Sequence, residues 1–187
     1  EIENLERIKK QVSELDICPL CKTKITPEHL KHVYDDCDKK IIELMNSDKE
    51  FLRGVGIRLA GEEYGATTQR PRRTGWTDLV ALKYAVGVNG PDLVLTKVDV
   101  LRCANEFKLA NGYGSNGEIF VRDSNSLRNR NPTYATFSGF NEDISKVSMF
   151  KDLPLGLRES IEYLEKFTGG KVRMISTGAD RNEEIIL

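Results

Sequence analysis

The spacing of apolar side chains separates residues 1–46 from the rest of the chain. Apolar residues first recur at intervals of three and four, which is the seam of a short coiled-coil helix. These residues are Leu5, Ile8, Val12 and Leu15. After a break, Thr26 suits an N-cap and Pro27 a first helical position, so a second helix is predicted from Pro27 to about Met45. Its apolar seam is Leu30, Val33, Cys37, Ile41 and Leu44.

Two helices joined by a short turn predict an antiparallel αα-hairpin, a short coiled coil, as a first domain over residues 1–46. The alternative is that the second seam is buried against the following part of the chain as ordinary core. The spacing of the apolar residues is compatible with both interpretations.

From residue 51 to 187 the pattern changes to alternating helices and strands. Helices are predicted from Asp78 to Val88 and from Leu155 to Thr168, where Gly169 and Gly170 stop the second one. Short apolar runs predict buried strands at residues 93–96 and 172–176. The segment from residue 111 to 132 is rich in Gly, Asn, Ser and Arg and predicts a surface excursion. The predicted fold class is α/β: the N-terminal hairpin, then part of a mixed α/β nucleotide-binding sheet.

Charge and composition exclude several classes of function. The formal net charge is −1, so no general field attracts nucleic acid or an anionic membrane. No apolar run approaches the roughly 20 residues of a membrane span, and Glu1 to Lys10 contains no signal-peptide core. We therefore expect a cytoplasmic protein with no membrane contact and no direct nucleic-acid binding. In a reducing compartment, a Cys-x-x-Cys pair more often binds metal than forms a disulfide.

Cys18 and Cys21 are spaced so that both thiolates can reach one tetrahedral zinc ion at roughly 2.3 Å. The other two ligands could be His32 and Cys37 of the same chain, close to a zinc-finger spacing. They could also be the cysteine pair of a second copy across a two-fold axis. The second arrangement is favoured, because Cys37 lies on the helix seam, where a thiol packs as a small hydrophobe. For His29 and His32, solvation near a helix start is the ordinary interpretation.

The segment Cys18 to His29, Cys-Pro-Leu-Cys-Lys-Thr-Lys-Ile-Thr-Pro-Glu-His, resembles the zinc hook of the DNA double-strand-break repair ATPase. In that family Cys-Pro-x-Cys lies at the apex of an antiparallel coiled coil, and two apices join through one zinc. The resemblance implies a zinc-bridged homodimer with Cys18 and Cys21 as ligands. It covers residues 1–46 without the family's long coil or ATPase head, so DNA tethering is not implied.

Three local strings predict binding of nucleotides or other anions. The first is Gly65-Ala-Thr-Thr-Gln-Arg-Pro-Arg-Arg-Thr-Gly-Trp76, with three arginines in four positions. Guanidinium groups match carboxylates and phosphates in bidentate geometry. A solvated basic loop is the alternative, because charge runs are usually surface.

The other two strings follow the predicted strands. Lys97-Val98-Asp99 suits a guanine base, because the carboxylate of Asp99 can accept from N1–H and the exocyclic amine while the lysine stem covers the ring. Ser176-Thr177-Gly178 adds a glycine that permits close backbone approach to a flat ligand.

Together, in this order, the strings resemble the C-terminal half of adenylosuccinate synthetase over residues 51–187. That family joins IMP to aspartate, using GTP and Mg2+, on the way to AMP. The resemblance implies that Arg70, besides its place in the aspartate loop, contacts IMP, and that Arg72 contacts GTP. The implied aspartate loop is Ala66, Thr67, Thr68, Gln69, Arg70, Pro71 and Arg72, and the implied guanine site is Lys97, Val98, Asp99, Ser176, Thr177 and Gly178.

Three departures from the family pattern limit the expectation. Gln69 replaces a usual glycine, and a side chain there is expected to affect the loop closure on which aspartate binding depends. Ala179 replaces a usual proline, a milder change. The family's Gly-Asp-Glu-Gly-Lys phosphate loop and its catalytic aspartate and histidine have no counterpart in the sequence. No catalytic residue is therefore assigned, and high turnover by this chain alone is not expected.

Three hypotheses follow. The first is a chimeric chain, with a zinc-mediated dimerisation hairpin fused to the substrate- and guanine-binding half of a synthetase. The second is a non-enzymatic zinc-hook interaction module whose α/β part has lost binding. The third is a synthetase completed in trans by a chain that carries the phosphate loop.

Overall fold

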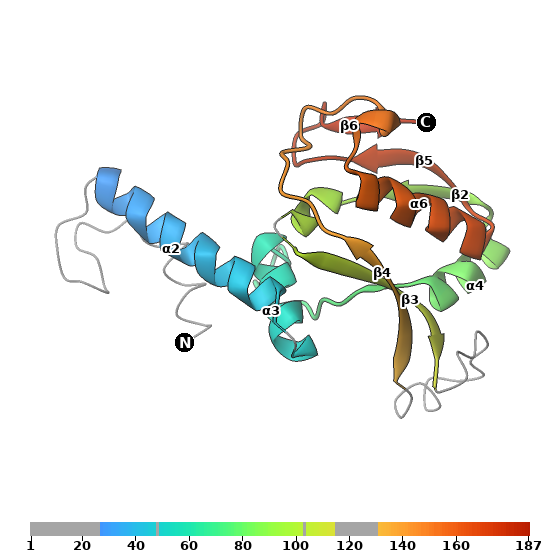
Figure 1. The fold of residues 1–187 in the computed structure, drawn as a ribbon, viewed down its shortest axis with the longest axis horizontal. Coiled ribbons are helices and arrows are strands. Elements are labelled where there is room, and N and C mark those ends of the chain that lie inside the picture. Colours follow the sequence, from blue (N-terminus) through green and yellow to red (C-terminus); the bar gives the residue numbers. More distant parts are fainter. Residues whose placement is uncertain (1–26, 48, 103, 115–130) are drawn as a thin grey trace. The chain divides into compact units, whose positions relative to one another are not determined.

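The computed structural model describes residues 27–47, 49–102, 104–114 and 131–187 (Figure 1). The chain divides into two compact units between Thr74 and Gly75, and each is described by itself. The first predicted helix and the pair Cys18 and Cys21 lie outside these ranges, as does the hairpin they would form. No helix within the ranges has the length and apolar character needed to cross a membrane.

In the first unit, helix α2 (Pro27–Met45) has the predicted start and end. It packs against helix α3 (Glu50–Ala60), which the sequence pattern did not predict. The approach is close at Gly56, where a Cβ atom would lie 2.5 Å from the backbone nitrogen of Met45. A side chain at Gly56 would therefore push the two helices apart.

The predicted seam of α2 is buried along its second half. Its buried members are Cys37, Ile41 and Leu44, and α3 contributes Val55 and Leu59 to the same unit's buried residues. Cys37 is buried and forms no disulfide, as expected of a thiol on the apolar seam.

Among its described residues, the second unit contains two three-stranded sheets (Figure 1). In the first, β3 (Glu106–Tyr113) lies between β1 (Thr77–Asp78) and β4 (Pro132–Ser138). Strand β1 runs parallel to β3, and β4 runs antiparallel to it. This sheet is therefore mixed, in agreement with the predicted class.

In the second sheet, β5 (Lys171–Ser176) lies between β2 (Asp92–Leu95) and β6 (Glu184–Ile186). Strands β2 and β5 are parallel, with Leu95 opposite Ile175, and β6 is antiparallel to β5. Both β2 and β5 agree with the predicted strands to within one residue. The prediction that both are buried is wrong for β2, in which no residue is buried and Val94 is 54% exposed. Their parallel pairing joins segments that are far apart in the chain.

Two helices of the second unit also follow the prediction. Helix α4 (Leu79–Asn89) is N-capped by Asp78, whose carboxylate accepts hydrogen bonds from the next turn's backbone. Helix α6 (Leu155–Thr168) ends at Gly169, which has φ 75° and therefore suits the left-handed C-cap. The helices pack on each other, and α6 also contacts β3, β4 and β5.

The predicted excursion from residue 111 to 132 is wrong at both of its ends. Residues up to Tyr113 continue β3, and β4 begins at Pro132. Asn111 and Gly112 have low strand propensity, but the strand continues because β4 supplies backbone partners on the far side of a register shift at these residues.

One apolar core joins the helices of the second unit to both sheets. Phe107, Leu79 and Ile175 are among its most deeply buried members. Phe107, Phe137, Tyr163 and Phe167 add a row of ring contacts along α6, with adjacent centroids 5.7 to 6.2 Å apart. Such pairs stabilise by more than their buried area alone.

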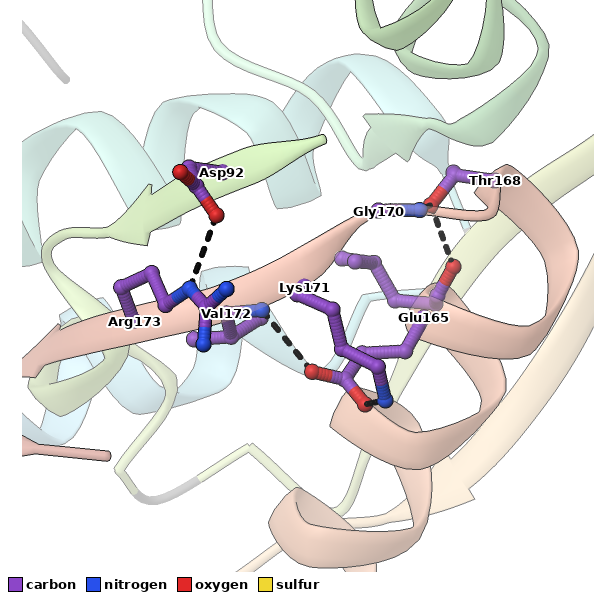
Figure 2. Close-up of polar contacts among 8 residues, drawn as sticks. Asp92, Glu165, Thr168, Gly170, Lys171, Val172 and Arg173 are labelled. Carbon is purple, nitrogen blue, oxygen red and sulfur yellow. Dashed lines mark hydrogen bonds and ion pairs between the residues drawn. The ribbon is translucent and has the colours of Figure 1, made fainter. Parts of the chain in front are cut away.

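Polar contacts fasten the end of α6 to the start of β5 (Figure 2). The carboxylate of Glu165 pairs with Lys171 and also accepts from the backbone of Val172. Across the sheet, Arg173 Nε donates to Asp92 Oδ1 at 2.8 Å. Because both of these side chains are mostly exposed, we expect the Asp92–Arg173 pair to stabilise little.

Candidate nucleotide site

The two predicted base-binding strings lie at one edge of a sheet. Because β2 and β5 are parallel neighbours with Leu95 opposite Ile175, the segments that leave them depart from the same edge. The 3-10 helix η2 (Val98–Leu101), which follows β2, also contacts β5. The structure thus brings Lys97-Val98-Asp99 and Ser176-Thr177-Gly178 to the same side of the second unit.

Lys97 adopts a left-handed backbone conformation, with φ 59° and ψ 33°, and caps η2. Val98 is buried in the core and anchors the turn, whereas Lys97 is exposed and Asp99 is partly buried. A buried anchor between two polar residues holds their backbone in place. The turn therefore presents an ammonium group and a carboxylate from a fixed support.

The second turn is held by hydrogen bonds within itself. Ser176 Oγ donates to the carbonyl oxygen of Gly178 at 2.9 Å. The backbone N–H of Thr177 donates to the carbonyl of Glu183 at 2.8 Å, one step beyond the last paired residues of β5 and β6. Thr177 is fully buried, and its hydroxyl has no hydrogen-bond partner among the residues described.

Glu183 was not singled out from the sequence, yet its side chain shapes this turn. A Cβ atom on Gly178 would lie 2.1 Å from Glu183 Oε2, so the carboxylate packs directly against the glycine. The same oxygen accepts a hydrogen bond from the backbone N–H of Asp180 at 2.9 Å. Sequence offered only a weak signal for this role, an acidic residue five positions after a turn glycine.

The arginine loop belongs to the first unit and has a structure of its own. Tyr64 and Pro71 form an isolated antiparallel bridge. Inside it, Gly65 N donates to Arg70 O, and Gln69 N donates to Gly65 O, both at 2.9 Å. The loop therefore closes on itself through its backbone.

The side chains of this loop are exposed from Ala66 to Arg73. Arg72 Nη1 nevertheless pairs with the partly buried carboxylate of Glu63 at 2.9 Å. Arg70 and Arg73 are exposed at the same loop. The loop thus offers several guanidinium groups to an anion, as expected of either an anion-binding or a solvated basic loop.

Gln69 adopts φ 55°. A glycine would adopt this conformation freely, whereas an L side chain there is strained. Its side-chain amide donates to the carbonyl of Ala66 at 3.2 Å and holds the turn from the side. The departure from the family's glycine is therefore accommodated by the fold of the loop, at a conformational cost.

The part of the chain described by the structure contains no group of three His, Cys, Asp or Glu side chains that could hold a metal ion. The predicted zinc ligands Cys18 and Cys21 fall outside that part. Both zinc arrangements, the shared site and the one completed by His32 and Cys37, remain predictions.

Comparisons with known proteins agree with the resemblance over residues 51–187. The family model for adenylosuccinate synthetase matches residues 43–185. The adenylosuccinate synthetase of Caldanaerobacter subterraneus is 42% identical over 149 residues, which cover 78% of this chain and 34% of the relative. The Borrelia duttonii enzyme is 39% identical over 142 residues, 73% of this chain and 33% of the relative. This chain therefore spans about one third of the length of these relatives.

A solved structure shows the same fold. Fully ligated adenylosuccinate synthetase from Plasmodium falciparum superposes with a TM-score of 0.67 at 32% identity, covering 77% of this chain and 35% of that one. The family match covers most of the chain and includes the arginine loop and both turns that the sequence predicts to bind a base. The chain belongs to the adenylosuccinate synthetase family.

Proposed function

We propose that this chain supplies the guanine-binding and aspartate-binding parts of an adenylosuccinate synthetase, which joins IMP to aspartate at the expense of GTP. The observation that carries the proposal is the parallel register of β2 and β5, with Leu95 opposite Ile175. This register places an acidic turn and a glycine turn at the same sheet edge, where α/β proteins bind ligands.

In this proposal the guanine base lies between the two turns. Asp99 accepts hydrogen bonds from the base's N1–H and exocyclic amine, because an ionised carboxylate is an acceptor with two oxygens. The stem of Lys97 covers the ring. Ser176, Thr177 and Gly178 flank the other side, where the absence of a side chain at Gly178 permits close approach.

The arginine loop takes the acidic substrate. Arg70 contacts aspartate and IMP, and Arg72 contacts GTP once it exchanges its pairing with Glu63 for the nucleotide. Ala66, Thr67, Thr68, Gln69 and Pro71 contribute the backbone and the hydroxyl groups of the loop. The family reaction also uses Mg2+, and no cluster of potential ligands occurs among the described residues, so none is assigned to the ion.

Isothermal titration of GTP into the full chain tests the base site. We expect saturable binding that discriminates against ATP, and a loss of about tenfold or more in affinity for Asp99→Asn, because hydrogen bonds to a charged group contribute about 1.5–3 kcal/mol. Asp152→Asn is the matched control, since Asp152 is exposed in the 3-10 helix η3 (Phe150–Asp152), away from both turns in sequence. Equal affinity of Asp99→Asn and wild-type protein would remove the assignment.

Catalysis is tested separately by mixing the chain with a second polypeptide that carries a phosphate loop. Formation of adenylosuccinate from GTP, IMP and aspartate only in the mixture would establish a synthetase completed in trans. No product in the mixture, with GTP binding retained, would limit this chain to ligand binding.

A zinc-bridged dimer through Cys18 and Cys21 is a second proposed function, supported by the Cys-Pro-Leu-Cys string between heptad-like segments. Native mass spectrometry before and after chelation tests it. One zinc per two chains, lost together with the dimer, supports the hook. One zinc per monomer supports the His32 and Cys37 arrangement, and a metal-free monomer refutes both.

A further inference from the structure

Glu183 is connected to the glycine turn by its backbone and by its side chain. Its carbonyl accepts from Thr177 N at 2.8 Å, and its own N–H donates to the carbonyl of Asp180 at 3.0 Å. Its carboxylate oxygen Oε2 accepts from Asp180 N at 2.9 Å. The segment from Asp180 to Glu183 is therefore closed by a reciprocal pair of hydrogen bonds between these two residues.

The carboxylate also fills the space that a side chain at Gly178 would occupy. A Cβ atom there would come within 2.1 Å of Oε2 and 2.7 Å of Cδ of Glu183. Both distances are far below van der Waals contact, so one of the two groups must be absent or displaced. A side chain at Gly178 would therefore displace the end of the Glu183 side chain from the turn.

This arrangement matters for the base site because Gly178 has no side chain that could fix its own position, so its neighbours must do so. Ser176 Oγ donates to the carbonyl of Gly178 from one side, and Glu183 packs against Gly178 from another. A turn held before the ligand arrives avoids the entropic cost of ordering it on binding.

We propose that Glu183 is a positioning residue for the guanine site: its carboxylate holds the Ser176–Gly178 turn in the shape that accepts the base. This inference rests on the proposed guanine-binding function and deepens it. Glu183 acts through the turn, by accepting the Asp180 N–H and by packing on Gly178, and its negative charge is not required.

Three substitutions of Glu183 separate the effect of its side-chain length from the effect of its negative charge. Glu183→Gln keeps the length of the side chain and an oxygen acceptor for Asp180 N–H, so GTP affinity is expected to stay within about twofold of wild type. Glu183→Asp keeps the charge but is shorter by one methylene, and Glu183→Ala removes the group. Both are expected to weaken GTP binding by about tenfold, equivalent to one lost hydrogen bond. Glu184→Ala, an exposed neighbour on β6, is the matched control and is expected to bind as wild type.

A ligand-independent measurement accompanies the titrations. Amide hydrogen exchange at Asp180 is expected to accelerate in Glu183→Asp and Glu183→Ala and to remain slow in Glu183→Gln. The steric part is tested by Gly178→Ala, which should weaken GTP binding less in the Glu183→Ala background than in wild type, because the clash is then absent.

The outcomes distinguish this inference from the function on which it rests. If Asp99→Asn weakens GTP binding but Glu183→Ala and Glu183→Asp do not, the guanine site stands and the role of Glu183 is refuted. Equal losses in Glu183→Gln and Glu183→Ala, with Glu183→Asp unaffected, would show that charge matters and would also refute it. If wild-type protein binds no GTP while exchange at Asp180 responds as expected, the proposed function has failed and Glu183 is a structural residue only.

Discussion

The side chain of Glu165, in the last turns of α6, accepts a hydrogen bond from the backbone N–H of Val172, in β5, at 2.8 Å (Figure 2). Its second carboxylate oxygen pairs with Lys171 Nζ, also at 2.8 Å. One carboxylate thus fixes the angle at which the chain leaves the helix and enters the central strand of the second sheet. The orientation of β5 matters because the Ser176–Gly178 turn follows it directly.

Acid should weaken this connection. Burial by itself would raise the pKa of Glu165, but hydrogen bonds from Lys171 and Val172 and nearby positive charges outweigh burial and lower the pKa below its ordinary value of 4.5. The stabilising contribution is therefore complete above pH 4.5 and is lost as pH falls through the lower folded-state pKa. Urea unfolding from neutral pH downward should show a stability difference between wild type and Glu165→Gln that shrinks in acid. A difference that grows in acid would contradict the assignment.

At neutral pH, Glu165→Ala should lower the free energy of unfolding by about 1.5–3 kcal/mol, because it leaves the amide of Val172 without its charged acceptor. The Glu165 side chain is only 21% exposed, so water replaces it poorly. Glu162→Ala, on an exposed position of the same helix, is the control and should change stability by less than about 0.5 kcal/mol. Equal free energies of unfolding for the two variants would show that the contacts of Glu165 with Lys171 and Val172 do not stabilise the fold.

Tyr113, at the end of β3, donates its hydroxyl to Asp78, which also caps α4 through Val80 N and Ala81 N. Burial, and secondarily the hydrogen bond to Asp78, raise the pKa of Tyr113 well above its ordinary value of 10.0. Its contribution to stability is thus complete below pH 10.0 and is lost as pH rises toward the folded-state pKa. Tyr113→Phe should destabilise by about 1.5–3 kcal/mol at neutral pH and by less in strong alkali.

Asp78→Ala should cost more than Tyr113→Phe, because it also removes the helix cap, which contributes about 0.5–2 kcal/mol. Chemical denaturation of the two single variants and the double variant measures this difference. If Tyr113→Phe destabilises the Asp78→Ala protein as much as it destabilises wild type, the two side chains are not coupled.

Gln69, in the arginine loop, is expected to be a strained position, because it has φ 55°. In Gln69→Gly and Gln69→Asn, the free energy of opening the loop should stay the same or rise. In Gln69→Val it should fall by about 1 kcal/mol or more. Amide exchange at Gly65 and residue 69, whose N–H groups close the loop, reports this directly. Thr67→Gly is the control, since Thr67 has no positive φ and glycine should only loosen the loop. Protection that falls equally in both glycine variants would show that no strain is stored at Gln69.

Two buried threonines should respond oppositely to removal of the hydroxyl. Thr177 Oγ1 has no partner within the described chain, so Thr177→Val should leave the free energy of unfolding unchanged or raise it by about 1–3 kcal/mol. Thr168 Oγ1 donates to Leu164 O and accepts from Gly170 N. Thr168→Val should therefore destabilise the protein by about 1–3 kcal/mol. Thermal and urea unfolding of the matched pair test this, and destabilisation by both variants would indicate an unseen partner for Thr177.

Several elements were predictable because their signals are local. Pro27 begins α2 and Gly169 ends α6, each at the residue expected from capping preferences. Helix α4 begins one residue after its predicted start, because Asp78 is its N-cap and not its first helical residue. The strands β2 and β5 are compact apolar runs. The three strings proposed to bind ligands were also recognisable in the sequence, since their chemistry depends on neighbouring residue types.

Strands β3, β4 and β6 and helix α3 were missed for one physical reason. They are very short, as β6 is, or contain residues of low propensity for the element, such as Gly54 and Gly56 in α3, and their stability comes from partners elsewhere in the chain. Strand β3, for example, contains Asn111 and Gly112 and persists because β4 pairs with it across the intervening residues. Helix α3 buries Val55 and Leu59 in a unit that also contains the seam of α2.

The sequence by itself determined which groups are available for the proposed nucleotide binding and which local turns carry them, because residue type and short-range spacing set hydrogen-bonding capacity and backbone preference. Folding determined that Lys97-Val98-Asp99 and Ser176-Thr177-Gly178 share one sheet edge, through the parallel pairing of β2 with β5. It also placed Glu183 against Gly178. Parallel pairing and close packing join residues that local preference does not connect, and they arise only when one core buries both segments together.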